Sequence, residues 1–382
     1  MIHKLVLLTL GFSILTGFNS EDSHSLASRF PNKLSEWNIF QIIDGKIRLS
    51  EGVIPYSLKN PLFSDYAFKY RTISIPRGKK VNYRQNGILD FPVGSVISKT
   101  FGYNQSDIVF PEQSENIQDL VSNVGLGNAQ ALTGIYRIET RILVKNQSGW
   151  TGIPYIWDPD QQDASLALIG RKIKVELTHP EIGEREFNYQ VPNFNQCKAC
   201  HVKYIEFSKP VLPIGPRAVN LNHMFNYESG IANQLEHWRA QGVLDGLVER
   251  EQRPSMVGWD DQNAEIEARA RAYLFANCAH CHGPQGPAST SGLFLGLDVR
   301  NPIELGICKT PVAAGNGGAG AIKFDIAPGD PEHSLMYHRL NSEDPAVMMP
   351  ELGRNLIHNK GVGLIYDWIA SMDGNCERFF KH

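Results

Sequence analysis

The sequence has no large excess of charge of either sign. Its 382 residues include 37 Lys and Arg and 40 Asp and Glu, which gives a formal net charge of −3. This balance excludes the strongly basic surface that binds nucleic acid, and the chain has no polybasic run of the kind that binds anionic membranes. Because 42% of the residues are hydrophobic and only 20% are charged, the composition is typical of folded domains. At this length we expect about two or three of them.

Long apolar runs are also absent, with one exception at the N-terminus. Fourteen residues from Leu5 to Phe18 are apolar apart from Thr, Ser and Gly, with Lys4 before them and polar residues at 19–22. A membrane-spanning helix needs about 20 apolar residues, so this run is typical of a cleaved signal peptide over residues 1–20. An uncleaved anchor is the alternative. We therefore expect a periplasmic or otherwise secreted protein whose mature chain does not span the membrane.

Cysteine is scarce, and its arrangement is informative. Four of the six Cys residues lie in two Cys-X-X-Cys-His segments. The composition alone predicts roughly 0.003 such segments in the chain, and this spacing is the signal for covalent haem attachment. The segments are Cys197–Cys200–His201 and Cys278–Cys281–His282.

The spacing has a chemical reason. Two thiols separated by two residues can add to the two vinyl groups of one haem, and the next His then faces the iron as proximal ligand. A redox dithiol would require a βαβ context, which is absent. A shared zinc site is disfavoured because Cys197 and Cys278 lie 81 residues apart and zinc does not require a His after each pair. The sequence therefore predicts two covalently attached haem c groups, with His201 and His282 as iron ligands.

Two further cysteines, Cys308 and Cys376, flank the second haem segment. Leftover cysteines often pair in an oxidising compartment, so we expect a disulfide here. Two buried free thiols are the alternative.

Residues 30–190 are expected to form a β-rich domain. Apolar residues alternate with polar or charged ones over 136–145, 172–177 and 187–191, and Tyr66, Phe68 and Tyr70 continue the pattern. Alternation with Pro and Gly between the runs predicts an antiparallel sandwich or small barrel with one face packed.

The pattern then changes to helix and loop, so the fold class is expected to be multidomain β plus α. A first haem unit is expected over 191–255, with a helix from Ile231 to Val243. A second over 260–376 has an amphipathic helix before Cys278, capped by Asp260 or Asp261, and another around Trp368.

The order of elements in residues 260–376 resembles a class I cytochrome c domain. A helix leads into Cys-X-X-Cys-His, a long loop follows, and a Met-Pro pair precedes the last helix. Met349, followed by Pro350, lies 67 residues after His282 and offers a soft thioether ligand to iron. Met348 is its main competitor. The first unit shows no evident sixth ligand: the candidates are His223, Met224, His237 and Met256, or an open position.

The chain resembles a family of bacterial dihaem c-type cytochromes that have an N-terminal β domain. The matching stretches span most of the chain: PLFSDYAFKYR, FPVGSVISKTF, ETRILV, YIWDPDQQDA, VPNFNQCKACH, NQLEHW, RARAYLFANCAHCHGPQGPASTSGL and MMPELGR. The resemblance implies a periplasmic location and electron transfer, with one or more redox partner proteins.

The sequence thus predicts an electron carrier rather than a self-contained enzyme. Two rivals stay open. In one, the first haem has an open coordination site and the protein is a peroxidase-like dihaem enzyme. In the other, the β domain is a ligand-binding module and the haems serve a partner oxidoreductase.

Overall fold

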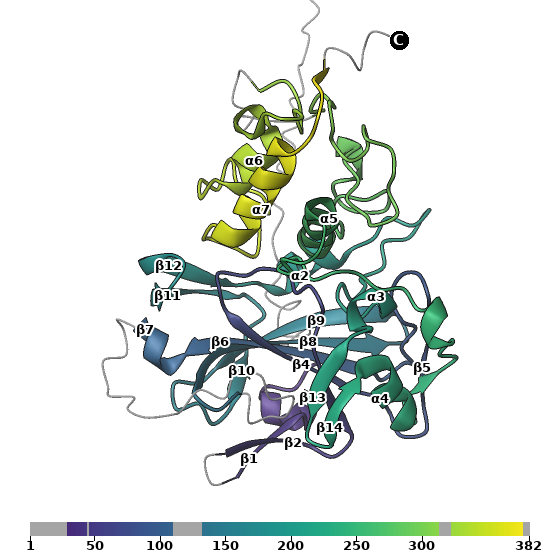
Figure 1. Ribbon diagram of the computed structural model, residues 1–382. Coiled ribbons are helices and arrows are strands. Elements are labelled where there is room, and N and C mark those ends of the chain that lie inside the picture. The colour runs from purple at the N-terminus through teal and green to yellow at the C-terminus, as the bar shows by residue number, and fades with distance from the viewer. Residues whose placement is uncertain (1–28, 44–45, 110–131, 313–321, 377–382) are drawn as a thin grey trace, which may run out of the picture.

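The computed structural model describes residues 29–43, 46–109, 132–312 and 322–376. The expected signal peptide over residues 1–20 lies outside the described residues. Figure 1 shows a β-rich part with a mainly helical part stacked on one side of it. Among the described residues, no helix is both long and apolar enough to cross a bilayer.

The largest element is a six-stranded antiparallel sheet with the order β10-β9-β8-β6-β4-β3. Its strands are β3 (Val53–Tyr56), β4 (Phe68–Ser74), β6 (Val96–Asn104), β8 (Ile135–Asn146), β9 (Gly149–Trp157) and β10 (Ala164–Leu166). A three-stranded sheet of β7 (Ile108–Val109), β11 (Arg171–His179) and β12 (Gly183–Val191) packs against it. The predicted antiparallel β domain is therefore confirmed, and the described sheet is open, with β10 and β3 at its edges.

Smaller elements surround the two sheets. The other strands are β1 (Phe40–Ile43) with β2 (Lys46–Leu49), β13 (Met224–Tyr227) with β14 (Gly230–Asn233), and β5 (Val81–Asn82) with β15 (Leu244–Asp245). The α-helices are α2 (Phe194–His201), α3 (Ala218–Leu221), α4 (Gln234–Ala240), α5 (Ile266–Asn277), α6 (Leu335–Leu340) and α7 (Asn359–Ala370). Short 3-10 helices are η1 (Leu34–Trp37), η2 (Gln105–Asp107), η4 (Arg250–Gln252), η5 (Ser289–Ser291) and η7 (Pro331–His333).

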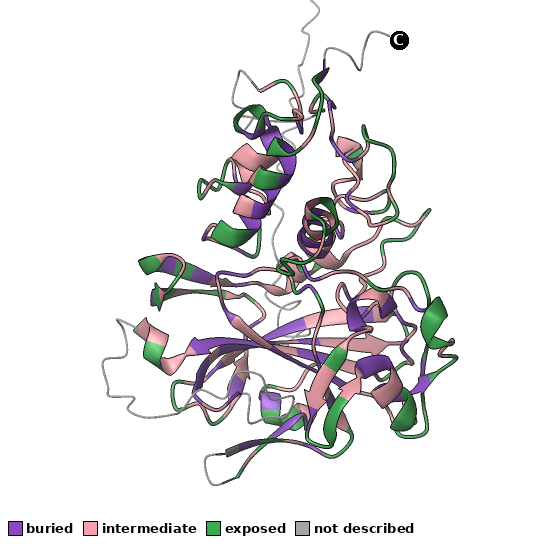
Figure 2. Cartoon of the chain, in the orientation of Figure 1, coloured by how far each residue is buried: buried purple, intermediate pink, exposed green. Residues whose placement is uncertain are grey.

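Both faces of the main sheet are covered, as the buried and half-buried strands in Figure 2 show. On one face, Ile142, Ile153 and Tyr155 pack against η1 and the β1–β2 hairpin. On the other, Ile73 and Ile97 pack against α3 and α4. The β domain is thus a layered structure with two cores, not a sheet with one solvated face.

Helices α5 and α7 form the core of the C-terminal part. Tyr273 and Leu274 of α5 pack against Ile365 and Trp368 of α7. Gly361 allows the close approach, because a Cβ there would lie 2.4 Å from ring atoms of Tyr273. The predicted helix around Trp368 is confirmed.

Three sequence predictions about element boundaries are wrong. Ile231 lies in β14 and is 70% exposed, because the Asn233 side chain accepts hydrogen bonds from the Leu235 and Glu236 N–H groups and starts α4 only at Gln234. Glu265, not Asp260 or Asp261, precedes α5. Tyr66 has a positive φ of 59° and lies before β4, whose first residue is Phe68.

The predicted disulfide between Cys308 and Cys376 is present. It ties the segment after α7 to the chain that follows the second Cys-X-X-Cys-His segment. A disulfide of this kind indicates an oxidising environment.

The loop between β3 and β4 joins the two parts of the molecule. The Asp65 carboxylate accepts hydrogen bonds from the backbone N–H groups of Asn355 (2.6 Å) and Leu356 (2.8 Å). The Tyr66 hydroxyl donates to the Ile357 carbonyl at 2.9 Å. The β domain therefore holds the loop that follows Met349.

Candidate haem-attachment sites

The first Cys-X-X-Cys-His segment lies on a helix that begins directly after a strand. β12 ends at Val191, and α2 is started by a reciprocal pair of hydrogen bonds between Asn193 and Gln196. Cys197, Cys200 and His201 follow at helical spacings of three and four residues, so they share one side of α2.

His201 is oriented by the backbone. Its Nδ1 lies 2.7 Å from the Leu212 carbonyl oxygen, which can only accept a hydrogen bond, so Nδ1 carries the proton. This leaves Nε2 free as a metal ligand, the arrangement that fixes ligating imidazoles in metal sites. Burial lowers the pKa of His201 to about 4, so the ring is neutral near pH 7, as ligation requires.

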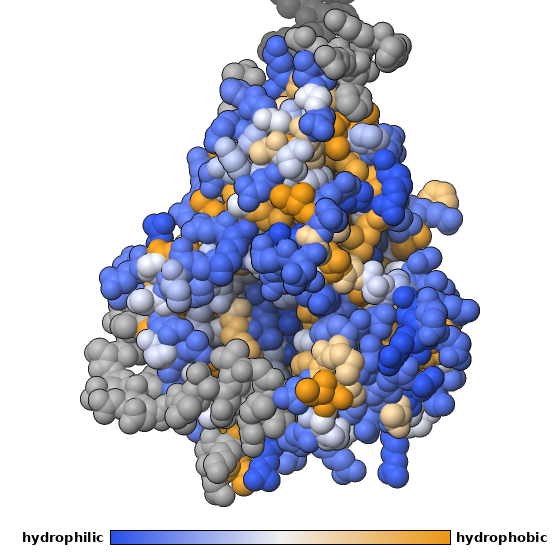
Figure 3. Space-filling view, viewed as in Figure 1, coloured by the Kyte–Doolittle hydropathy of each residue, from blue (hydrophilic) through white to orange (hydrophobic). Residues whose placement is uncertain are grey.

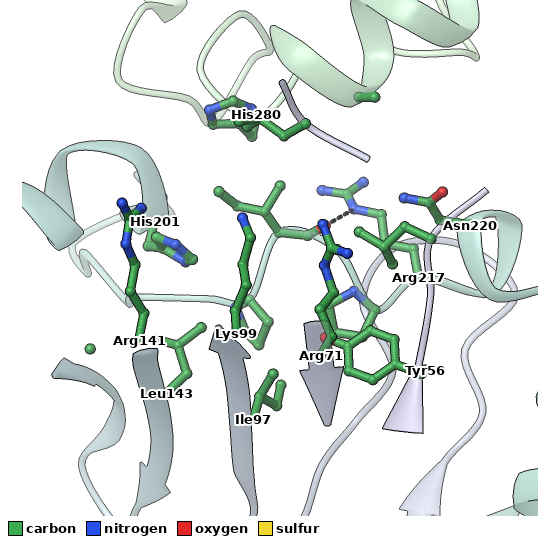
Figure 4. Close-up of a pocket in the computed structure, with 18 of the residues that line it drawn as sticks. Tyr56, Arg71, Ile97, Lys99, Arg141, Leu143, His201, Arg217, Asn220 and His280 are labelled. Atoms are coloured by element: carbon green, nitrogen blue, oxygen red, sulfur yellow. Dashed lines mark hydrogen bonds between the residues drawn. The ribbon is translucent and has the colours of Figure 1, made fainter. Parts of the chain in front are cut away.

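Cys197 and His201 line a small cavity of about 120 Å³, here called the first cavity. It lies between the main sheet and the helical part (Figure 4). Gly152 of β9 forms part of its wall, and a Cβ there would lie 3.0 Å from the Cβ of Cys197 and 3.4 Å from its Sγ. A side chain at position 152 would crowd the thiol.

The second segment follows α5 without a break. Asn277 is the last residue of α5, and the N–H groups of Cys281 and His282 bond to the Cys278 carbonyl at 3.0 and 2.8 Å. Burial lowers the pKa of His282 to about 4. His282 is therefore also neutral near pH 7.

A larger cavity of about 530 Å³, the second cavity, is lined by Cys278, Cys281, His282 and Met349. This volume is within the range of cofactor pockets, roughly 300–1,000 Å³. Met348 does not line it and is 6% exposed. The structure thus brings Met349, and not Met348, to the same cavity as the proximal His that the sequence predicts.

The backbone of Met349 is hydrogen-bonded on both sides. Its N–H donates to the Arg339 carbonyl at 2.9 Å, and its carbonyl accepts from Arg354 Nε at 3.0 Å. The buried Arg354 guanidinium also bonds to the carbonyls of Arg339, Leu340 and Ser342. The Met349–Pro350 peptide bond is cis.

The two Cys-X-X-Cys-His segments touch each other. Lys203 Nζ donates to the His280 carbonyl at 2.6 Å, and the Tyr204 N–H donates to the Gln285 carbonyl at 2.8 Å. Cys200 lines the second cavity, and a hydrogen bond from the Cys281 thiol lowers the pKa of Cys200 and raises that of Cys281. Segments about 80 residues apart in the sequence thus form one unit.

None of the four candidates for a sixth ligand at the first site lines the first cavity. His223 is engaged with Gln234 at 2.9 Å, His237 stacks on Tyr227, and Met224 is 57% exposed.

His280 lines both cavities instead. It is 5% exposed, and its Nδ1 has no hydrogen-bond partner. The sequence analysis did not consider His280, because it occupies a variable position of the second Cys-X-X-Cys-His segment.

Basic side chains form the sheet-side wall of the first cavity. Arg71, Lys99 and Arg141 point into it from the strands, and Arg217 lies across from them (Figure 4). The alternation in β8 had placed Arg141 on the polar side of the strand, and the structure shows that this side is the cavity wall.

The residues present fit a haem group at each segment. At the second segment both thiols and His282 line one cavity, whereas at the first segment Cys197 and His201 line the first cavity and Cys200 lines the second. Arg71 and His280 line the first cavity, and each has a buried nitrogen without a hydrogen-bond partner.

Comparisons of the chain with protein-family models, with curated proteins and with solved structures give no match.

Proposed function

We propose that this protein is a secreted dihaem c-type cytochrome that transfers single electrons between redox partner proteins. In it, Cys197 and Cys200 hold one haem and Cys278 and Cys281 hold the other. Bound haem iron supplies the one-electron chemistry, by cycling between its ferric and ferrous states. His201 and His282 would each hold the iron of one haem, and Met349 would offer a second ligand to the iron at the second site.

The observation that carries this proposal is the contact between the two segments. Cys200 of the first lies at the wall of the second cavity, and His280 of the second lines the first cavity. Two cofactors attached here would have neighbouring edges, which suits transfer of an electron from one to the other. Two unrelated binding sites would have no reason to share a wall.

The surface near the second cavity supports exchange with a partner. Tyr204, Val312 and Leu352 line this cavity and are 42%, 69% and 40% exposed. Figure 3 shows orange, hydrophobic residues gathered on the helical part, while the β part is mostly hydrophilic. An exposed apolar rim is a feature of protein docking sites.

One observation favours a second candidate, a peroxidase-like enzyme. The four side chains that the sequence offered as a sixth ligand do not reach the first cavity. If His280 does not ligate that haem either, its sixth position is open to a small substrate.

The test is haem content and spin state. The wild-type protein should carry two covalent haems, and Cys197→Ala/Cys200→Ala should carry one. Two low-spin haems in the oxidised wild type support electron transfer alone, and a high-spin first haem supports the enzyme. A wild-type protein without covalent haem contradicts both.

A further inference from the structure

Three cations lie side by side on one face of the main sheet. Arg71 of β4 is opposite Lys99 of β6, which is opposite Arg141 of β8. Side chains directly opposite each other on neighbouring strands have Cβ atoms about 4.5–5.5 Å apart, and like charges there destabilise the sheet. Burial and the two neighbouring arginines lower the pKa of Lys99 well below its ordinary value, so the row is relieved either by loss of the Lys99 proton or by a compensating anion.

The described residues around the row do not supply enough negative charge. Glu139 is fully buried, and its carboxylate is engaged by Arg141 Nε at 2.9 Å and by the Tyr189 hydroxyl at 2.6 Å. Glu139 therefore neutralises Arg141 only.

The other two cations of the row have no such carboxylate. Lys99 Nζ lies over the Phe101 ring, 4.6 Å from its centroid. Arg71 is 5% exposed, its Nη1 makes one long bond of 3.4 Å to the Lys69 carbonyl, and its Nη2 has no partner. A buried guanidinium nitrogen without an acceptor is costly, and its position identifies where an acceptor is missing.

All three cations and Arg217 line the first cavity together with Cys197 and His201. We propose that Arg71, Lys99, Arg141 and Arg217 bind the two propionate carboxylates of the haem attached to Cys197 and Cys200. This inference rests on the proposed function. Haem carries its two propionates on the side of the ring opposite the vinyl-derived carbons that bind the thiols, and Arg side chains recognise carboxylates with two parallel hydrogen bonds.

The first cavity would have to widen to take a haem group. At about 120 Å³ it is smaller than a typical cofactor pocket of roughly 300–1,000 Å³. The long side chains of Lys99 and Arg71 extend into it from the sheet (Figure 4). Propionates at its edge would draw these side chains aside and join the space to the second cavity past His280, which lines both.

The decisive experiment is a stability cycle with Lys99→Met in the full-length, secreted protein. In the Cys197→Ala/Cys200→Ala background no first haem is attached, so Lys99→Met removes a buried amine that lies between two arginines without an anionic partner and should raise the denaturant midpoint. In the wild-type background the same change removes a partner of a propionate and should lower it. Lys172→Met, an exposed cation on β11, is the matched control and should show the same small effect in both backgrounds.

Two spectroscopic readouts accompany the cycle. Loss of the Lys99 charge favours ferric iron, so the ratio of oxidised to reduced first haem should rise about tenfold. This corresponds to a reduction potential about 59 mV lower, and the potential of the second haem should not change. The propionate bending band in the resonance Raman spectrum should also move in Lys99→Met and Arg71→Gln but not in Lys172→Met.

Two results would overturn the inference. One is the same sign of the Lys99→Met effect in both backgrounds. The other is a saturable shift of the first-haem spectrum when formate is added to the wild type and its loss in Lys99→Met, because the cations would then bind an external anion. If the wild type lacks covalent haem at Cys197 and Cys200, the proposed function fails first, and haem staining separates that case from failure of the inference.

Discussion

Met348 and Met349 are neighbours in the chain, but their side chains lie in different surroundings, and this allows a crossed test of iron ligation. Met349 borders the cavity that also contains His282. Met348 is 6% exposed and does not line that cavity. Replacing each by Ala should therefore damage different properties of the protein.

Met349→Ala should remove the soft sixth ligand of the second haem and leave the haem attached to Cys278 and Cys281. Since a Met/His pair raises the potential of haem iron, the potential should fall. Axial ligands cover a range of roughly 0.8 V, so we expect a fall on the order of 100 mV or more. The weak near-infrared sulfur-to-iron band should disappear, and carbon monoxide should bind the reduced protein quickly.

Met348→Ala should instead cost stability. Truncating a buried Met to Ala typically destabilises a domain by about 2–5 kcal/mol. The near-infrared band and the potential should survive, and the midpoint of urea unfolding should fall. Met349→Ala should have a smaller effect on that midpoint, because its side chain borders an open space.

The assays are a redox titration, near-infrared absorption of the oxidised protein and urea unfolding, made on both variants. If the band survives in Met349→Ala and vanishes in Met348→Ala, the wrong methionine has been chosen. If it survives in both, the second haem is not ligated from this loop, and the resemblance to class I cytochrome c loses its main support.

Three further predictions concern single positions. Gly152→Val should lower haem staining from two groups per chain toward one, because its side chain would crowd Cys197; unchanged staining contradicts this. His280→Ala should convert one low-spin haem to high-spin if the His280 Nδ1, which has no hydrogen-bond partner, ligates the first haem, and an unchanged spectrum excludes that role. Burial lowers the pKa of His358 to about 3, against 6.5 in the unfolded chain, so the unfolded state binds the extra proton as the pH falls below 6.5. Relative to His358→Phe, the wild type should lose about 2 kcal/mol of unfolding free energy between pH 8 and pH 5, and equal pH dependence would contradict the burial argument.

The elements that the sequence predicted well are those with a local cause. Strand β8 follows from alternation alone, and helix α7 from apolar residues at helical spacing that meet α5. The start of α4 was missed because its neighbour Ile231 belongs to a hairpin. That hairpin is set by the positive φ of Gly230 and by pairing with β13, neither of which follows from apolar spacing.

In the candidate site, too, the residues with a local sequence signal were predicted and those that depend on tertiary contacts were not. Cys-X-X-Cys-His spacing has a chemical cause, so it predicts attachment thiols and proximal imidazoles without knowledge of the fold. His280 lies inside one such segment, and its importance depends on the other segment lying against it, through contacts such as that of Lys203 with the His280 carbonyl. This is tertiary information, and the sequence offers no signal for it.

The row of Arg71, Lys99 and Arg141 shows that a strand can be predicted correctly while the surroundings of its polar face are predicted wrongly. Alternation places Ile142 on one side of β8 and Arg141 on the other, and a polar side usually faces solvent. Here that side is covered, and Glu139 next to Arg141 is fully buried.

The charge pattern of a polar strand face differs between a face exposed to solvent and a face that is covered. On β11, exposed Lys174 is balanced by Glu186 at 2.9 Å, the mixture of signs that solvent-facing strands carry. Across β4, β6 and β8 the facing residues are all cations: Arg71, Lys99 and Arg141. One sign repeated across three neighbouring strands is unfavourable, and a negatively charged group at that wall would relieve it. Recognising it requires the strand register, because the three residues lie 28 and 42 positions apart in the sequence.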